Sequence, residues 1–308
     1  MAINKAKRTA MKALSQITSV DVKKTYEAER TLETVRAKMR FKPPLYQTWD
    51  FDVICGGHSV PVRIFRPRIE TAKGILLFIH GGGWVTGNID SYDRVCGIMS
   101  RKTGKTVISV DYSLAPEHPF QIGLEDCYAA TKAILQSDIK GAGADQLTLI
   151  GDSAGGNLAA AVSLLARDRG EFQIQRQILI YPATNNDHSE TSPYPSVMEN
   201  GFDYILTAKR VSEFMDLYQS CEEDKYNPYF APLLEKDYSN QPRTLIITAE
   251  FCPLRDEGEE YGRRLLKAGN DVTVYRVRDA IHGFFSLPPR HPHVKRAYLY
   301  INRFLRGD

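Results

Sequence analysis

The amino-acid sequence predicts an α/β protein in which helices cover both faces of a mainly parallel β-sheet. Short runs of leucine and β-branched residues recur along most of the chain, and helical patterns separate most of them. Runs of near-continuous apolar character are typical of strands that are buried on both faces, as in parallel sheets. A chain of 308 residues is long enough for one large domain of this class with insertions, or for two small domains.

The first segment of the chain is predicted to be helical and basic. Residues 3–40 space apolar positions among charges and contain neither glycine nor proline. Phe41-Lys42-Pro43-Pro44 then ends the pattern, because proline cannot continue a helix. Residues 1–42 hold eleven Lys or Arg against four Asp or Glu. Because no aromatic residues are interleaved for base stacking, this charge is more typical of a solvated helix face than of a surface for nucleic acid or membrane.

The remaining chain predicts eight strands and one long insertion. An antiparallel pair at 48–55 and 60–65 is joined by Gly56-Gly57. Six further runs follow at 74–79, 106–110, 147–150, 177–181, 243–248 and 272–277, with helical patterns at 125–136, 154–167 and 257–268. The interval 185–227 breaks this alternation with a Ser- and Pro-rich start and a helical pattern at 209–219. A long insertion of that kind predicts a lid or cap.

A glycine-flanked serine directly follows the 147–150 run. Ser153 lies between Gly151 and Gly155 in the spacing G-x-S-x-G, which suits a sharp strand-to-helix turn that exposes a nucleophilic hydroxyl. The spacing alone arises by chance in on the order of one chain in ten. An ordinary loop serine is therefore the alternative, and residues elsewhere in the chain must decide between the two interpretations.

Two other segments supply the partners that such a serine needs. His80-Gly81-Gly82-Gly83-Trp84 follows the 74–79 run, and consecutive glycines leave backbone N–H groups free to face a cavity where an oxyanion develops. His282 lies just past the last predicted strand, at a position suited to a general base. Together these segments favour Ser153 as a nucleophile and His282 as its base.

Four segments together resemble the hormone-sensitive lipase-like family of microbial carboxylesterases, an α/β-hydrolase group. They are the loop at 80–84, the run D-Y-S-L-A-P-E-H-P-F at 111–120, G-D-S-A-G-G-N at 151–157 and P-L-R-D-E-G at 253–258. The likeness extends from about residue 50 to the end of the chain.

The resemblance implies an α/β-hydrolase fold with a mostly parallel eight-stranded sheet, helices on both faces and a helical cap. The cap would consist of an N-terminal segment, residues 1–45, and of an insertion at about 185–227 in a catalytic domain of residues 46–308. It further implies that the N–H groups of Gly82, Gly83 and Ala154 form the oxyanion hole.

The sequence departs from the family pattern at one catalytic position. An aspartate immediately before the Pro-Leu-Arg-Asp run holds the histidine in that family, whereas this chain has Cys252 there. A thiol is a weak hydrogen-bonding group and ionises near pH 8.5 unless its environment shifts it. Asp256 and Glu250 are the two nearby carboxylates that could substitute. We favour Asp256 slightly, although a helix cap is an equally ordinary role for it.

These observations predict a carboxylic ester hydrolase that acts on short-chain acyl esters through an acyl-enzyme on Ser153. An amidase or lactonase would use the same groups, and a ligand-binding protein is a third alternative. The plant gibberellin receptor resembles this family and has lost a triad member. The cysteine at position 252 is therefore an argument for the ligand-binding alternative. The aromatic side chains that could either line an acyl or alcohol pocket or pack in the core are Trp84, Tyr92, Phe202, Tyr204, Phe214 and Phe285.

Composition limits the cofactors, partners and compartment. The five cysteines are scattered without metal-ligand spacing, so we expect no metal, no other cofactor and a reducing, cytoplasmic compartment. No apolar run approaches the ~18 residues of a membrane span, and the first residues are too polar for a secretory signal. The expected partner is a small-molecule ester, with no nucleic acid and no stable membrane insertion; a homodimer is left open.

Overall fold

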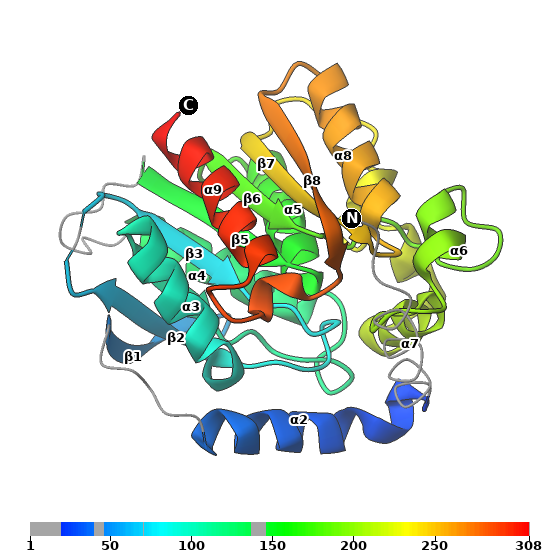
Figure 1. The fold of residues 1–308 in the computed structure, drawn as a ribbon, viewed down its shortest axis with the longest axis horizontal. Coiled ribbons are helices and arrows are strands. Elements are labelled where there is room, and N and C mark those ends of the chain that lie inside the picture. The colour runs from blue at the N-terminus through cyan, green and yellow to red at the C-terminus, as the bar shows by residue number, and fades with distance from the viewer. Residues whose placement is uncertain (1–19, 40–45, 70, 137–145, 308) are drawn as a thin grey trace.

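Eight strands form one sheet in the computed structural model, which describes residues 20–39, 46–69, 71–136 and 146–307 (Figure 1). The strand order is β1-β2-β4-β3-β5-β6-β7-β8. The strands β1 and β2 pair antiparallel, as do β2 and β4, and every other neighbouring pair is parallel. The prediction of a mostly parallel eight-stranded sheet is therefore confirmed. The strand bounds are β1 Tyr46–Cys55, β2 His58–Pro67, β3 Ile75–Ile79, β4 Thr106–Val110, β5 Leu147–Asp152, β6 Arg176–Ile180, β7 Arg243–Phe251 and β8 Val272–Ile281.

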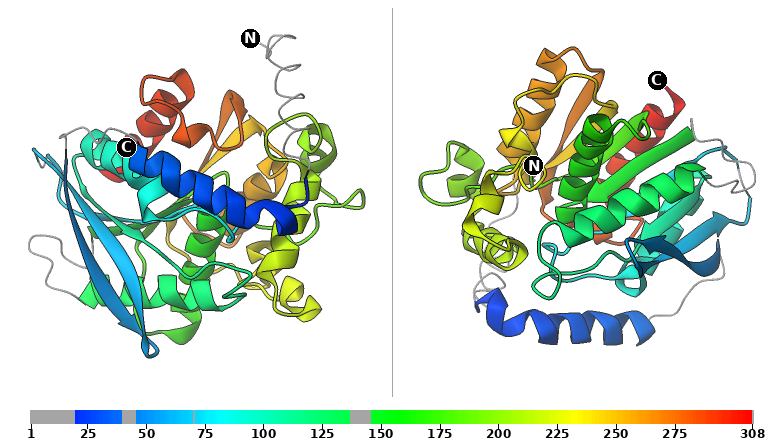
Figure 2. Two further views of the ribbon diagram at one scale, coloured as in Figure 1. Left: turned by 90° about the horizontal axis from the view of Figure 1, so that it is seen from below. Right: turned by 180° about the vertical axis from the view of Figure 1, so that it is seen from behind.

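Helices cover both faces of this sheet. Figures 1 and 2 show α3 and α9 on one face and α4 and α5 on the other. The sequence analysis identified no helix at α3, although Asn88 and Ser91 form a capping box at its start. The helix bounds are α2 Val22–Met39, α3 Ile89–Thr103, α4 Ile122–Gln136, α5 Ala154–Arg169, α6 Pro195–Asn200, α7 Ala208–Tyr218, α8 Arg255–Lys267 and α9 Pro292–Arg306, with short 3₁₀ turns η2 Glu222–Tyr226, η3 Pro232–Leu234 and η4 Phe284–Ser286.

The centre of the core lies where β3 and β5 meet α5. Every residue of β3 and of β5 is buried, which is the reason for their near-continuous apolar sequence. The helix α5 begins with small residues, and a Cβ added at Gly155 would lie only 2.1 Å from the carbonyl oxygen of Ile79. Because a side chain cannot fit there, glycine lets α5 approach the end of β3. This approach brings the turn before α5 next to the glycine loop after β3.

The N-terminal helix α2 lies along the side of the sheet and contacts α3 and α7 (Figure 1). Its Arg30 side chain donates to the carbonyl oxygens of Val85 and Ala115 at 2.6 Å each and pairs with Glu117 at 2.9 Å. The rest of the predicted cap segment 1–45, including the Pro43-Pro44 boundary, lies outside the described residues. No described helix is both long enough and apolar enough to cross a membrane.

Candidate active site

Ser153 occupies a strained turn between β5 and α5. Its backbone has φ 55° and ψ −121°, a conformation that a non-glycine residue adopts only when its surroundings enforce it. The N–H of Ser153 donates to the carbonyl oxygen of Ile180 at 2.9 Å. A Cβ at Gly151 would lie 2.1 Å from the oxygen of Gly155. Both flanking glycines are therefore required for the turn, as the G-x-S-x-G spacing predicts.

The loop after β8 brings His282 to this serine, across 129 positions of sequence. Its Nε2 lies 2.9 Å from Ser153 Oγ, so the hydroxyl can donate to the imidazole. Glu250 holds the end of β8, just before this loop, by accepting a hydrogen bond from the N–H of Asp279 at 2.6 Å. Burial lowers the pKa of His282 to about 3. The imidazole is therefore neutral near pH 7 and able to accept a proton.

Cys252 faces the other nitrogen of the same imidazole. Its Sγ lies 3.1 Å from His282 Nδ1, and the residue is fully buried. Burial raises the pKa of the thiol well above its usual range, although a backbone hydrogen bond from Leu254 opposes the shift. With Nε2 accepting from the serine, Nδ1 carries the ring proton and donates to the sulfur. A neutral thiol thus occupies the place where the family pattern has a carboxylate.

The structure does not bring Asp256, the acid that we favoured from the sequence, to His282. Its carboxylate accepts from the N–H of Ser196 at 2.7 Å and pairs with Arg255 at 2.6 Å. Asp256 lies in the first turn of α8, where a carboxylate meets free backbone N–H groups and a favourable dipole. These contacts turn the side chain toward α6, which Ser196 begins together with Pro195. Glu250, the other candidate, binds Asp279 as described above.

The glycine loop is fixed to the serine turn by a buried carboxylate that the sequence analysis missed. Asp152 accepts from the N–H of Gly81 at 3.0 Å and from the hydroxyls of Tyr92 and Tyr181 at 3.3 and 3.2 Å. Burial raises its pKa to about 6 despite these three hydrogen bonds. Its place directly before Ser153 in the G-D-S run was a signal that could have identified it.

Gly82 and Gly83 have conformations that other residues rarely adopt. Their φ angles are 121° and 62°, and a Cβ at Gly83 would lie 2.4 Å from the ring of Phe214. Glycine at both positions therefore allows the loop to turn its backbone toward the site.

A cavity of about 300 Å³ brings the predicted site residues together. Ser153, His282, Gly82, Gly83 and Ala154 all line it. Among the six aromatic candidates, Trp84, Tyr92 and Phe214 line it and the other three do not: Phe202 is 58% exposed, Tyr204 packs on Phe251 and Phe285 packs on Tyr298. The remaining lining residues are Glu33, Asp152, Ala183, Ile205, Leu206, Val211, Leu254, Gly283 and Ser286.

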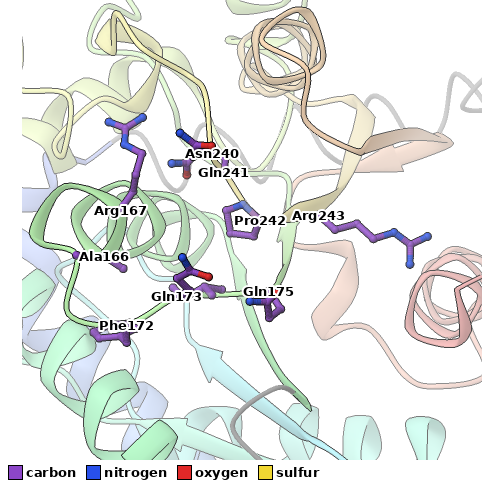
Figure 3. Close-up of a pocket in the computed structure, with 11 residues that line it drawn as sticks. Ala166, Arg167, Phe172, Gln173, Gln175, Asn240, Gln241, Pro242 and Arg243 are labelled. Carbon is purple, nitrogen blue, oxygen red and sulfur yellow. The ribbon is translucent and has the colours of Figure 1, made fainter.

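A second cavity, of about 480 Å³, lies at the opposite edge of the sheet (Figure 3). It is lined by Arg243 at the start of β7 and by residues just before β6, whereas Ser153 follows the end of β5. Its lining includes amide side chains such as Gln173 and Gln241, and Arg243 points away from Arg167 (Figure 3). None of its lining residues belongs to the predicted site.

Comparison with known proteins agrees with the geometry. A family profile described as the alpha/beta hydrolase fold matches residues 76–286. An arylesterase from Saccharolobus solfataricus is 35% identical over 263 residues, which are 85% of each chain. A carboxylesterase from Mycobacterium tuberculosis is 32% identical over 274 residues, again 85% of each chain.

A solved structure agrees as well. The hyperthermophilic esterase from the archaeon Pyrobaculum calidifontis has a TM-score of 0.86 at 34% identity, covering 100% of this chain and 99% of that one. The profile match, the related sequences and the shared architecture lead to one assignment. The chain belongs to the α/β hydrolase family, in its hormone-sensitive lipase-like branch.

Proposed function

We propose that the protein hydrolyses short-chain carboxylic esters through an acyl-enzyme formed on Ser153. The observation that carries this proposal is the 2.9 Å contact between Ser153 Oγ and His282 Nε2 inside a cavity that the glycine loop also lines. Related proteins of comparable length are named as an arylesterase and a carboxylesterase. The cavity of about 300 Å³ is at the small end of the usual range for ligand pockets, which favours short acyl chains.

The chemistry has two halves. Ser153 Oγ attacks the ester carbonyl carbon while His282 Nε2 takes the hydroxyl proton. The carbonyl oxygen becomes an oxyanion that the N–H groups of Gly82, Gly83 and Ala154 stabilise. Collapse of this intermediate breaks the bond to the alcohol, which leaves with the proton from Nε2. Water then attacks the acyl-enzyme by the same steps, releasing the carboxylic acid and restoring the serine.

Cys252 acts in this scheme as a positioning residue. It accepts the Nδ1–H hydrogen bond and so selects the tautomer in which Nε2 is free to accept the serine proton. A protonated thiol supplies no full negative charge to stabilise the imidazolium that forms during attack. We therefore expect a lower kcat than a carboxylate at this position would give.

Two segments of the chain are proposed to close the pocket as a cap. The helix α2 contributes Glu33, and the insertion contributes Ile205, Leu206, Val211 and Phe214 to the cavity wall. These four apolar residues line the same cavity as Ser153, which suits the apolar part of an ester.

Covalent labelling tests the proposal directly. A fluorophosphonate probe is expected to add one covalent group to the wild type and none to Ser153→Ala, as measured by intact mass. Ser286→Ala is the matched control, because Ser286 is a second serine that lines the same cavity, and it should label like the wild type. Labelling that persists in Ser153→Ala would move the nucleophile elsewhere, with Cys252 as the first suspect.

Turnover separates the alternatives. Burst kinetics with a series of p-nitrophenyl esters should show acylation followed by slower release, with the highest kcat/KM for short acyl chains. Faster cleavage of matched anilides or lactones would favour the amidase or lactonase. Labelling of Ser153 without any turnover would favour a ligand-binding protein.

A further inference from the structure

The residues of the Ser153 cavity that can carry a charge near pH 7 are both acidic. Among the described residues, its wall includes the carboxylates of Glu33 and Asp152 and no lysine or arginine. In the ester hydrolysis proposed above, neither carboxylate has a contact with the substrate. The two carboxylates differ in their capacity to contact a bound ester.

Asp152 is already occupied. Its two oxygens accept from the N–H of Gly81 and from two tyrosine hydroxyls, so it holds the loop and has little remaining capacity for a ligand.

Glu33 is placed differently. Its Oε2 accepts from the N–H of Gly87 at 3.0 Å, and no described residue is hydrogen-bonded to its Oε1. A carboxylate with one oxygen anchored and the other unpartnered is oriented for a ligand. Burial raises its pKa, although the Gly87 hydrogen bond and the charges of Arg36 and Arg210 lower it.

Neither arginine near Glu33 occupies the position beside its Oε1 that a ligand would take. Arg210 pairs with Glu29 at 2.6 Å and lies over the ring of Phe214 at 5.1 Å. Arg36 is exposed, and neither arginine lines the cavity. The aromatic residues Trp84 and Tyr92 do line it. A partly buried carboxylate in a cavity that aromatic side chains also line is a combination that can bind an ammonium group.

We propose that Glu33 is a specificity-determining residue that selects esters carrying an ammonium group. The inference rests on the proposed ester hydrolysis and adds a substrate class to it. A cation on the substrate would contact Oε1 of Glu33, whereas an anionic substituent would meet a wall that holds only negative charge. The carboxylic acid product is repelled by the same wall once it ionises, which assists its release.

A matched pair of substrates tests the proposal. Acetylcholine and 3,3-dimethylbutyl acetate have nearly the same shape and differ in one positive charge. We expect the wild type to show a kcat/KM ratio of at least about tenfold in favour of acetylcholine, as expected for one charge-assisted contact. Glu33→Gln should reduce this ratio toward one, because the amide oxygen can still accept from Gly87 while the charge is removed. An equal ratio in both proteins would overturn the proposal.

The control variant is Glu27→Gln. Glu27 is an exposed carboxylate on the same helix and does not line the cavity. It controls for the loss of one negative charge from α2, and its substrate ratio should match that of the wild type. A ratio that falls equally in Glu27→Gln would mean that the charge of the helix, not a contact with Glu33, selects the substrate, which would contradict the proposal.

A binding measurement separates failure of this inference from failure of the proposed function. Calorimetry with choline and with 3,3-dimethylbutanol on Ser153→Ala needs no turnover. Choline should bind at least about tenfold more tightly, and Glu33→Gln in that background should remove the difference. Equal affinities would refute the ammonium site even if esters are hydrolysed. Selective choline binding without hydrolysis of any ester would retain the site and refute the proposed function.

Discussion

His282 lies between a hydroxyl and a thiol, and this pair of contacts sets its acid–base behaviour. A carboxylate at Nδ1 would favour the protonated imidazole and raise its pKa. The buried thiol of Cys252 carries no charge, so burial alone acts on the imidazole and its pKa falls to about 3. In the proposed mechanism the imidazole is therefore available as a base over a wider range of acidic pH, but the imidazolium that would form during attack is less stable.

The first prediction concerns the acid limb of the pH profile. Because His282 acts in its neutral form and its pKa is lowered, kcat/KM should persist well below the usual imidazole pKa of about 6.5. Cys252→Asp should move the limb to higher pH, since the new charge raises the pKa of the imidazole. Rate measurements between about pH 4 and 8 check both statements. A limb near pH 6.5 in the wild type that does not move in the variant would contradict them.

Asp152 does not confound that measurement through unfolding. Its pKa is raised from 3.8 to about 6. Between these two pH values the carboxyl group is therefore protonated in the folded protein and ionised in the unfolded chain. As pH falls from about 6 toward 3.8, this group therefore increases the free energy of unfolding. Melting curves at each pH between about 4 and 6 show whether a loss of rate there comes with unfolding.

At the scale of elements, the site depends on helices brought together from distant parts of the chain. The helix α2 reaches the segment after the glycine loop through Arg30, whose guanidinium donates to the carbonyl oxygens of Val85 and Ala115. The same helix presents Glu33 to the cavity one turn further on. Thus α2 contributes Glu33 to the cavity wall and contacts the segment after the glycine loop, and we expect its position to affect substrate binding.

The second prediction is that Arg30→Ala raises KM more than it lowers kcat. Loss of its charge-assisted hydrogen bonds loosens α2 against the loop, and we expect KM to rise about three- to tenfold. Lys24→Ala is the control, because Lys24 is exposed on the same helix, and its kinetics should match the wild type. Unchanged KM and unchanged acyl-chain selectivity in Arg30→Ala would mean that α2 does not shape the pocket.

At the scale of the whole molecule, local sequence patterns predict most of the strands and helices. The bounds of β4 agree with the sequence prediction at both ends, because a buried strand between polar flanks is unambiguous. Ser153 was placed by its flanking glycines and His282 by its position after the last strand. The helix α3 is absent from the sequence prediction because its residues mix apolar and charged positions, so its start is marked mainly by the capping residue Asn88.

The environment of His282 could not be predicted in the same way. Asp256 is only four positions from Cys252, but its side chain follows a contact with Ser196, 60 residues away. Glu33 reaches the cavity through Gly87, 54 residues away. Neither contact leaves a pattern in the local sequence, since each depends on how the cap packs against the sheet. The positions of the motif residues follow from local sequence patterns. Which carboxylate reaches which site depends on tertiary contacts.

A neutral thiol stands where a carboxylate would stabilise the imidazolium, and no carboxylate among the described residues takes its place at His282. Cys252→Ser, a neutral variant of similar size, controls for the shape of the site, and melting curves confirm that each variant is folded. In Asp256→Asn and Glu250→Gln, kcat should fall by less than about tenfold, since neither carboxylate contacts His282.

The most direct measurement is kcat for Cys252→Asp against the wild type with one short-chain ester. The charge acts as the transition state develops, so kcat should rise toward ~10³-fold while KM changes little. A rise of less than about tenfold in the folded variant would contradict the account, because it would mean that another group already stabilises His282.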